Sequence, residues 1–299
     1  MTPLWQRAPV GVVGLGLIGG SLGLDLMAAG ARVRALVHRP ASAARARERG
    51  LAGEVSTDPS VLRGCGLVVL ALPLDRLLDP DPALVAALPA GAVITDVGSV
   101  KEPVLRRWQG LLRAAGGGRD GARFVASHPM AGTAQAGVEA GVTGLFRGRP
   151  WVATPAPDTD PEALAAVRQL AEAVGARWLC CEADAHDRAV ALISHLPVLV
   201  GAALLQAADA GAAEAGAGGA GAALVRALAS SGFADTTRVG GGNPELGLLM
   251  ARTNREALLA ALGHYRQAIE ILETLVEREE WPDLQRSLQR CQRLRPDFL

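Results

Sequence analysis

A glycine-rich loop between an apolar run and a helix-like segment most constrains how this chain can fold. The run Val10–Val13 is followed by Gly14, Gly16 and Gly19, which have the G-x-G-x-x-G spacing. In this motif the first glycine permits a tight turn, the second lets the backbone approach a pyrophosphate, and the third lets helix and strand pack closely. A second β-like run follows at residues 32–37. The spacing predicts a strand–loop–helix–strand unit that binds a dinucleotide, and the alternative is a glycine-rich turn that binds nothing.

The start of the helix and the end of the second strand indicate which dinucleotide is bound. A pyrophosphate sits on the free N–H groups of the helix N-terminus, so we expect Leu17 and Ile18 to bind cofactor together with the three glycines. NAD-binding proteins place Asp or Glu at the second strand end to bind the ribose 2′-OH, whereas this strand ends in His38 and Arg39. Arg39 can hold a 2′-phosphate by a charge-assisted fork. We therefore predict that His38 and Arg39 contribute to binding NADP, with NAD possible and a solvated surface arginine as the alternative.

The length of the chain and its pattern of predicted strands and helices indicate two domains. A single core rarely exceeds about 250 residues, and this chain has 299. Up to residue 183, β-like runs alternate with helical segments, which predicts an α/β fold with a Rossmann-type, doubly wound and mostly parallel sheet. After that point the pattern is helical only. We predict a dinucleotide-binding domain at 1–183 and an all-helical substrate and dimerisation domain at 184–299.

The expected elements can be placed by residue number. The β-like runs after the glycine loop lie at 67–72, 92–97, 123–127, 151–154 and 177–181. The helical segments of the second half lie at 184–208, 221–231, 244–279 and 281–293, with Asp184 as a cap and Pro244 near a start. The low-complexity stretch 209–221 is expected to be a flexible connection.

Composition excludes several classes of function. The formal net charge is zero and aromatic residues make up 3%, so neither a basic patch nor stacking platforms indicate nucleic acid. The four cysteines have no metal-binding spacing and are expected to be reduced thiols of a cytoplasmic protein without a metal. Asp25 and Arg32 interrupt the apolar N-terminal stretch, so no signal peptide or membrane span is expected there. We expect a small-molecule substrate. The apolar helical half predicts a homodimer.

Chemistry is expected where the parallel strands end, because ligands of such sheets bind beyond the carboxyl ends of the strands. His128 follows the run 123–127 directly, and its neutral imidazole can accept a proton near pH 7. The alternative is a structural, hydrogen-bonding histidine. Ser99 can position the nicotinamide or a substrate hydroxyl. The alternative is that Ser99 is a helix N-cap and that Lys101 is a solvated surface charge.

Two residues of the helical half are further candidates. Pro197 predicts a kink near His195, which is either a satisfied core histidine or part of a substrate pocket. His186 lies half a turn out of phase with His195, so the two do not form a metal pair. In the predicted loop 232–245, Arg238 is either a surface charge or a clamp for a carboxylate.

Together these segments resemble the prephenate/arogenate dehydrogenase family, from about residue 9 to about residue 290. The resemblance is carried in order by GLGLIGGS at 14–21, TDVGSVK at 95–101, HPMAGT at 128–133, SHLP at 194–197 and SSGFADTTRVGGGNPE at 230–245. It is closest to the single-function cyanobacterial-type arogenate dehydrogenases. The resemblance implies a Rossmann-like first domain and a helical dimerisation domain. It implies His128 as catalytic histidine, Ser99 as the residue that orients hydroxyl and nicotinamide, and His195 and Arg238 as substrate-binding residues.

The resemblance implies NADP-dependent oxidative decarboxylation of prephenate or arogenate to 4-hydroxyphenylpyruvate or tyrosine, a step of tyrosine biosynthesis. One alternative is another β-hydroxyacid or imine oxidoreductase of the same two-domain plan. That class uses a lysine in the helical domain, and the segment 184–197 contains none. The other alternative is a non-catalytic NADPH-binding sensor, which would have no reason to combine His128, His195 and Arg238.

Overall fold

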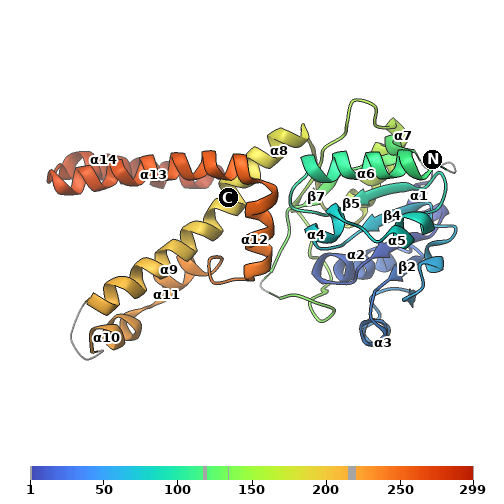
Figure 1. The fold of residues 1–299 in the computed structure, drawn as a ribbon, viewed down its shortest axis with the longest axis horizontal. Coiled ribbons are helices and arrows are strands. Elements are labelled where there is room, and N and C mark those ends of the chain that lie inside the picture. The colour runs from blue at the N-terminus through green and yellow to red at the C-terminus, as the bar shows by residue number, and fades with distance from the viewer. Residues whose placement is uncertain (1, 117–119, 134, 215–219, 299) are drawn as a thin grey trace. The chain divides into compact units, whose positions relative to one another are not determined.

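The structure is a computed structural model that describes residues 2–116, 120–133, 135–214 and 220–298 (Figure 1). The chain divides into two compact units. The first contains Met1–Val190 and Gly242–Thr253, and the second contains Ala191–Gly241 and Asn254–Leu299. The short segment Gly242–Thr253 thus belongs to the first unit, although in the sequence it lies between the two parts of the second.

The first unit is built on a six-stranded sheet in which every strand pair is parallel. Its order β3-β2-β1-β4-β5-β6 is that of the dinucleotide-binding fold. In this order the strands are Glu54–Ser56, Val33–Leu36, Val10–Val13, Leu67–Leu70, Val93–Asp96 and Phe124–Val125. The central strand β1 pairs with β2 and β4, with Val10 opposite Val33 and Leu67. The predicted α/β fold is confirmed.

Helices cover both faces of this sheet and bury two separate hydrophobic clusters. One cluster joins β1 to α2 and α7 through residues such as Leu22 and Leu170, and the other joins β4 and β5 to α4, α5 and α6 through residues such as Leu77 and Trp108. The helices are α1 (Leu4–Arg7), α2 (Leu17–Ala28), α3 (Pro40–Glu48), α4 (Leu74–Leu78), α5 (Pro82–Ala87), α6 (Glu102–Ala115) and α7 (Pro161–Ala173), with 3-10 turns at Pro59–Leu62 and Gly121–Arg123.

A second, three-stranded sheet corrects the predicted strand assignment. The runs 151–154 and 177–181 were assigned to the main sheet, but β8 (Pro150–Ala153) and β9 (Arg177–Cys180) pair with each other and with β7 (Ser127–Pro129) instead. β7 is antiparallel to β8, and β8 is parallel to β9. The predicted strand 123–127 is broken because the chain leaves the first sheet after β6 and continues in the second.

One buried serine, Ser127, connects the two sheets through hydrogen bonds. Ser127 Oγ donates to the carbonyl of Asp96 at 2.8 Å and bonds to Thr95 Oγ1 at 2.9 Å, both on β5 of the first sheet. From the second sheet, Trp151 Nε1 donates to the same oxygen at 3.0 Å. Because this one hydroxyl satisfies donors and acceptors from both sheets, it fixes the strand that follows it, β7.

The remaining helices follow the second sheet along the chain. They are α8 (Ala183–Val190), a π-helical turn (Ala191–His195), α9 (Leu196–Glu214), α10 (Ala220–Leu228), α11 (Ser231–Thr237), α12 (Pro244–Thr253), α13 (Arg255–Glu277), α14 (Trp281–Leu294) and a 3-10 turn (Arg295–Phe298). The units divide them so that α8 and α12 lie in the first. Within the second unit, Gly240 approaches Gly201 of α9 so closely that an added Cβ would lie 2.2 Å from backbone carbon.

Several helical predictions are confirmed and several are wrong. A π-helical turn ends at His195, where the kink was predicted, and Pro244 begins α12 as expected. The predicted helix 244–279 is interrupted at Asn254, and the predicted loop 232–245 begins within α11. Asp184 lies in the first turn of α8 and pairs with Arg188 rather than capping the helix. The predicted flexible connection 209–221 is helical at 209–214, and residues 215–219 lie outside the described residues.

Candidate active site

The glycine loop has the geometry that a dinucleotide requires. Gly14 has φ +94°, and a Cβ there would lie 2.3 Å from the carbonyl oxygen of Ala71. A Cβ on Gly19 would lie 1.9 Å from the carbonyl oxygen of Gly14. By contrast, a Cβ on Gly16, the N-cap of α2, would meet nothing within 4 Å. Two glycines thus allow the turn and the helix packing, while the space beside the third, at the N-terminus of α2, is open, so the loop fits a pyrophosphate.

The end of β2 presents two exposed basic side chains. His38 and Arg39 follow β2 directly, and Arg39 is the N-cap residue of α3. Arg39 Nε donates to His38 Nε2 at 2.8 Å. No described carboxylate lies within ion-pair distance of Arg39. The guanidinium is therefore available to an anionic ligand.

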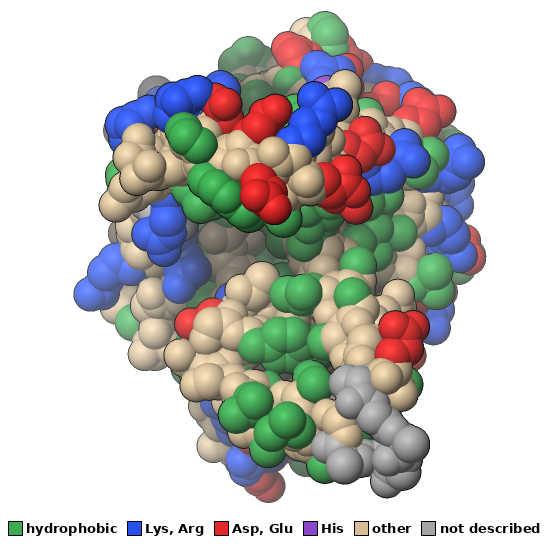
Figure 2. All heavy atoms as spheres, turned by 90° about the vertical axis from the view of Figure 1, so that its left-hand side faces the viewer, with side chains coloured by type: hydrophobic (Ala, Val, Ile, Leu, Met, Phe, Trp, Pro, Cys, Tyr) green, Lys and Arg blue, Asp and Glu red, His purple; other side chains and the backbone are tan. Residues whose placement is uncertain are grey.

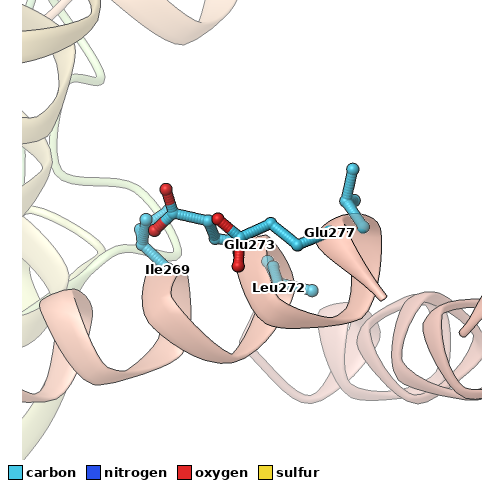
Figure 3. Close-up of a pocket in the computed structure, with 5 residues that line it drawn as sticks. Ile269, Leu272, Glu273 and Glu277 are labelled. Carbon is cyan, nitrogen blue, oxygen red and sulfur yellow. The ribbon is translucent and has the colours of Figure 1, made fainter. Parts of the chain in front are cut away.

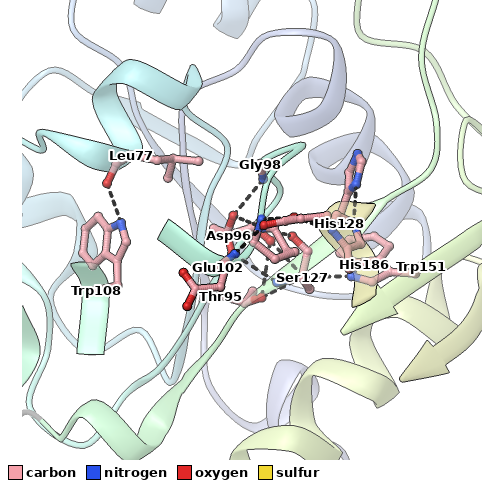
Figure 4. Close-up of polar contacts among 12 residues, drawn as sticks. Leu77, Thr95, Asp96, Gly98, Glu102, Trp108, Ser127, His128, Trp151 and His186 are labelled. Carbon is pink, nitrogen blue, oxygen red and sulfur yellow. Dashed lines mark hydrogen bonds and ion pairs between the residues drawn. The ribbon is translucent and has the colours of Figure 1, made fainter. Parts of the chain in front are cut away.

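His128 lies within a strand and not in the loop predicted after one. It is the middle residue of β7, opposite Val152 of β8, and its side chain is half-buried. His128 Nδ1 lies 3.0 Å from Nε2 of His186, which is on α8 (Figure 4). The two rings meet edge to face, with centroids 5.2 Å apart. His186 is buried, and its pairing with His128 was not predicted, because the two residues are 58 positions apart in the sequence.

Asp187 contacts His186 and was not predicted from the sequence. Asp187 Oδ1 lies 2.8 Å from His186 Nδ1 and also accepts the backbone N–H of Lys101 at 2.7 Å. Asp187 Oδ2 accepts the N–H of Glu102 at 2.9 Å. Asp187 therefore caps α6 at its N-terminus, so the interpretation of Ser99 as N-cap is wrong.

Lys101 is fully buried, which corrects its interpretation as a solvated charge. Its ammonium forms an ion pair with the buried carboxylate of Asp96 and donates to the carbonyl of Ser127 at 2.7 Å. Burial lowers the pKa of Lys101, and the charge of Asp96 opposes that shift. Asp96 also accepts the N–H groups of Gly98 and Ser127 at 2.8 and 3.1 Å. This network, drawn in Figure 4, connects the loop after β5 with the strand that carries His128.

The other predicted residues are distributed over both units. Ser99 is half-buried in the loop between β5 and α6, one residue beyond Gly98 of this network. His195 and Arg238 belong to the second unit. His195 is 1% exposed, and its Nδ1 lies 3.2 Å from the amide nitrogen of Asn254. Arg238 is exposed directly after α11.

A pocket elsewhere on the protein lacks the features of a binding site. It lies on α13 alone and is lined by Ile269, Leu272, Glu273, Val276 and Glu277 (Figure 3). Three apolar side chains and two carboxylates at helical spacing form one face of a helix rather than a convergent set of polar groups. Among the described residues, no group of three or more His, Cys, Asp or Glu could hold a metal ion.

Comparison with known proteins follows the same division of the chain. The family model for the prephenate dehydrogenase nucleotide-binding domain matches residues 22–180. The family model for the prephenate dehydrogenase dimerization domain matches residues 182–290. Together these matches cover most of the chain.

Individual relatives agree with the family models. A cyclohexadienyl dehydrogenase of Zymomonas mobilis is 30% identical over 274 residues, which cover 91% of this chain and 89% of the relative. The crystal structure of a Synechocystis arogenate dehydrogenase is 40% identical, with TM-score 0.78 over 97% of this chain and 100% of that one. A prephenate dehydrogenase from A. aeolicus, in complex with hydroxyphenyl propionate and NAD+, is 26% identical, with TM-score 0.85 over 97% and 98% of the two chains.

Proposed function

The chain belongs to the prephenate dehydrogenase family, and on that premise we propose that it is a cytoplasmic, NADP-dependent enzyme that oxidatively decarboxylates arogenate or prephenate in tyrosine biosynthesis. The observation that carries the proposal is His128, a half-buried imidazole in the same compact unit as the glycine loop. We assign residues 1–183 to nucleotide binding and 184–299 to substrate binding and dimerisation. Family membership argues against a non-catalytic sensor and against an unrelated imine or hydroxyacid reductase.

The chemistry assigns a distinct task to each proposed residue. The bound nicotinamide supplies the acceptor for the hydride that leaves C4 of the substrate ring. His128 takes the proton of the C4 hydroxyl, and Ser99 orients that hydroxyl. The C1–carboxylate bond then breaks, its electron pair makes the ring aromatic, carbon dioxide leaves, and the ring oxygen regains the proton from His128. Arg238 and His195 hold the substrate, so the chain orients groups and moves one proton.

The activity is tested by following absorbance at 340 nm with the purified protein. Arogenate and prephenate are each offered with NADP and with NAD. We expect reduction of NADP with at least one of the two substrates, and the 40% identity to an arogenate dehydrogenase supports arogenate. Absence of reduction in all four combinations would contradict the proposed function.

Arg39 is expected to select NADP over NAD. In the variant Arg39→Ala, the KM for NADP should rise roughly 10–150-fold, which corresponds to the loss of about 1.5–3 kcal/mol from a charge-assisted contact. The KM for NAD should change little, because NAD has no 2′-phosphate. Steady-state kinetics with both cofactors measures the ratio, and equal changes in the two KM values would show that Arg39 does not contact the 2′-phosphate.

Arg238 is expected to bind a carboxylate that is present in both ground and transition states. Arg238→Gln should therefore raise the substrate KM by roughly 10–150-fold, with a smaller decrease in kcat. The variant Arg252→Gln is a matched control, because Arg252 lies near the end of α12 and no role is assigned to it. An Arg238→Gln enzyme with unchanged KM and reduced kcat would contradict this assignment.

The helical half exposes many large apolar side chains. The helical run Ala183–Glu214 is long and apolar enough to cross a membrane by length and composition, and only 22% of its most apolar window is buried. Figure 2 shows hydrophobic side chains uncovered on the upper helices, α13 and α14, and on the lower ones, α9 and α10. Large exposed apolar residues include Leu204, Leu224, Leu228, Ile271, Trp281 and Leu288. We assign this surface to a homodimer, as the match to a dimerization domain supports.

Light scattering at micromolar concentration tests the dimer. The expected mass is twice the 30.8 kDa of one chain, in the absence of detergent or lipid. Replacement of Leu228, which is 72% exposed, by Glu should shift the population toward monomer if this side chain lies in the interface. A wild-type mass near that of one chain would contradict the assignment.

A further inference from the structure

We propose that His186 and Asp187 are positioning residues that hold His128 with a proton on Nδ1 and its basic lone pair on Nε2. The inference rests on the proposed function, because it gives His128 the task of accepting the substrate proton. It concerns three side chains within one compact unit, linked in the order His128, His186, Asp187. Nothing in the sequence motifs links the second and third of these residues to His128.

Asp187 is a hydrogen-bond acceptor at the N-terminus of α6. Two backbone N–H groups at the N-terminus of α6, those of Lys101 and Glu102, point at its two carboxylate oxygens. These N–H groups have no acceptor within the helix, and the positive end of the helix dipole favours a negative charge at this place. Asp187 therefore serves as an ionised acceptor for its third neighbour, His186.

The proton positions on both imidazoles follow from that acceptor. The carboxylate of Asp187 requires His186 to carry its proton on Nδ1, since their separation is 2.8 Å. A neutral imidazole has one N–H, so Nε2 of His186 is an acceptor. The partner at 3.0 Å, Nδ1 of His128, must then be the donor. Nε2 of His128 is left as the basic nitrogen, which is the arrangement a proton acceptor needs.

The contacts of His128 with His186, and of His186 with Asp187, also favour the charged form of His128 that arises during the reaction. When His128 accepts the substrate proton it becomes an imidazolium, and its Nδ1–H bond to His186 becomes charge-assisted and stronger. The negative charge of Asp187 lies directly beyond His186, which is buried together with it. The arrangement thus fixes the orientation of His128 before the reaction and stabilises its cation afterwards.

The proton positions can be measured without substrate. Long-range ¹⁵N–¹H spectra of the histidine-labelled full chain distinguish the two tautomers, and the spectrum of His128→Asn identifies the signals of His128. We expect both His128 and His186 to carry their protons on Nδ1, although the Nε2–H form predominates for a histidine in water. A wild-type His128 with its proton on Nε2 would overturn the proposal.

Two substitutions at one position separate the positioning role from packing. His186→Phe keeps a ring of similar shape but removes both nitrogens, whereas His186→Gln retains a carbonyl that can accept from His128 Nδ1. We expect His186→Phe to move the proton of His128 to Nε2 and to lower kcat roughly 10–100-fold with little change in KM, less than loss of the base itself. His186→Gln should keep the Nδ1–H tautomer and recover most of the rate.

The outcomes distinguish this inference from the proposed function. If the wild-type enzyme oxidises neither arogenate nor prephenate, the proposed function fails, while the spectrum still decides how His128 is protonated. If the wild-type enzyme is active but His186→Phe retains kcat within roughly twofold, or His186→Gln is no better than His186→Phe, the positioning role is wrong and the function stands.

Discussion

Replacement of His128 by asparagine is expected to lower kcat by roughly 10²–10⁴-fold while KM stays nearly unchanged, because a general base contributes in the transition state. Asparagine keeps a polar side chain, but its amide cannot accept the hydroxyl proton as a base. The wild-type rate should fall on the acid side as the imidazole becomes protonated and loses its basic lone pair. That acid limb should be absent from the pH profile of the variant.

A matched control uses another histidine of the same chain. His264 is exposed on α13 and has no assigned role, so His264→Asn should keep both the rate and the acid limb. Arg238→Gln is expected to give the opposite signature, a raised KM with a smaller change in kcat. If His128→Asn retained a rate near that of the wild type, or showed the same defect as Arg238→Gln, the roles assigned to these two residues would be wrong.

Replacement of Lys101 by methionine is expected to destabilise the first unit by about 3–5 kcal/mol, the cost of leaving one charge of a buried pair without its partner. The side chains of Lys101 and Asp96 are both fully buried. The substitution also removes the hydrogen bond from Lys101 to the carbonyl of Ser127. The position of β7, the strand that carries His128, should therefore be less well fixed. Urea unfolding followed by tryptophan fluorescence measures the change, because Trp108 and Trp151 are buried in this unit.

Two further variants establish the cause of this effect. In the double variant Asp96→Asn/Lys101→Met no buried charge is left unpaired, so it should be more stable than Lys101→Met alone. Arg188→Met removes one partner of an exposed pair with Asp184, and the expected cost is less than about 1 kcal/mol. A loss at Lys101→Met as small as at Arg188→Met would contradict the account of the buried pair.

The parts that sequence predicts well are those specified by local patterns. The strand Val10–Val13 and the glycine loop were predicted because their spacing is itself the geometric requirement, as the contacts at Gly14 and Gly19 show. An irregularity near His195 was predicted in the same way, as a kink, since Pro197 lacks the N–H that a regular helix needs, and the structure has a π-helical turn there. In each case the cause lies within a few residues of the effect.

The parts that sequence misses depend on contacts between distant residues. His186 is 58 residues from His128, and Asp187 is 86 residues from Lys101, so no spacing rule joins them. Lys101 was interpreted as a solvated charge, because the Ser127 carbonyl that accepts its buried ammonium lies 26 residues away in the sequence. The change of sheet after Val125 is equally invisible locally, because a run such as 123–127 has the same pattern in either sheet.

The most direct test of the central claim is the stoichiometry of oxidation and decarboxylation. Arogenate or prephenate labelled with ¹³C in the ring carboxylate is incubated with the enzyme and NADP, and labelled carbon dioxide and NADPH are measured together. The account predicts one carbon dioxide released for each NADPH formed, in the wild type and in the slow His128→Asn variant alike. Formation of NADPH without labelled carbon dioxide would contradict oxidative decarboxylation and indicate a simple dehydrogenation at another carbon.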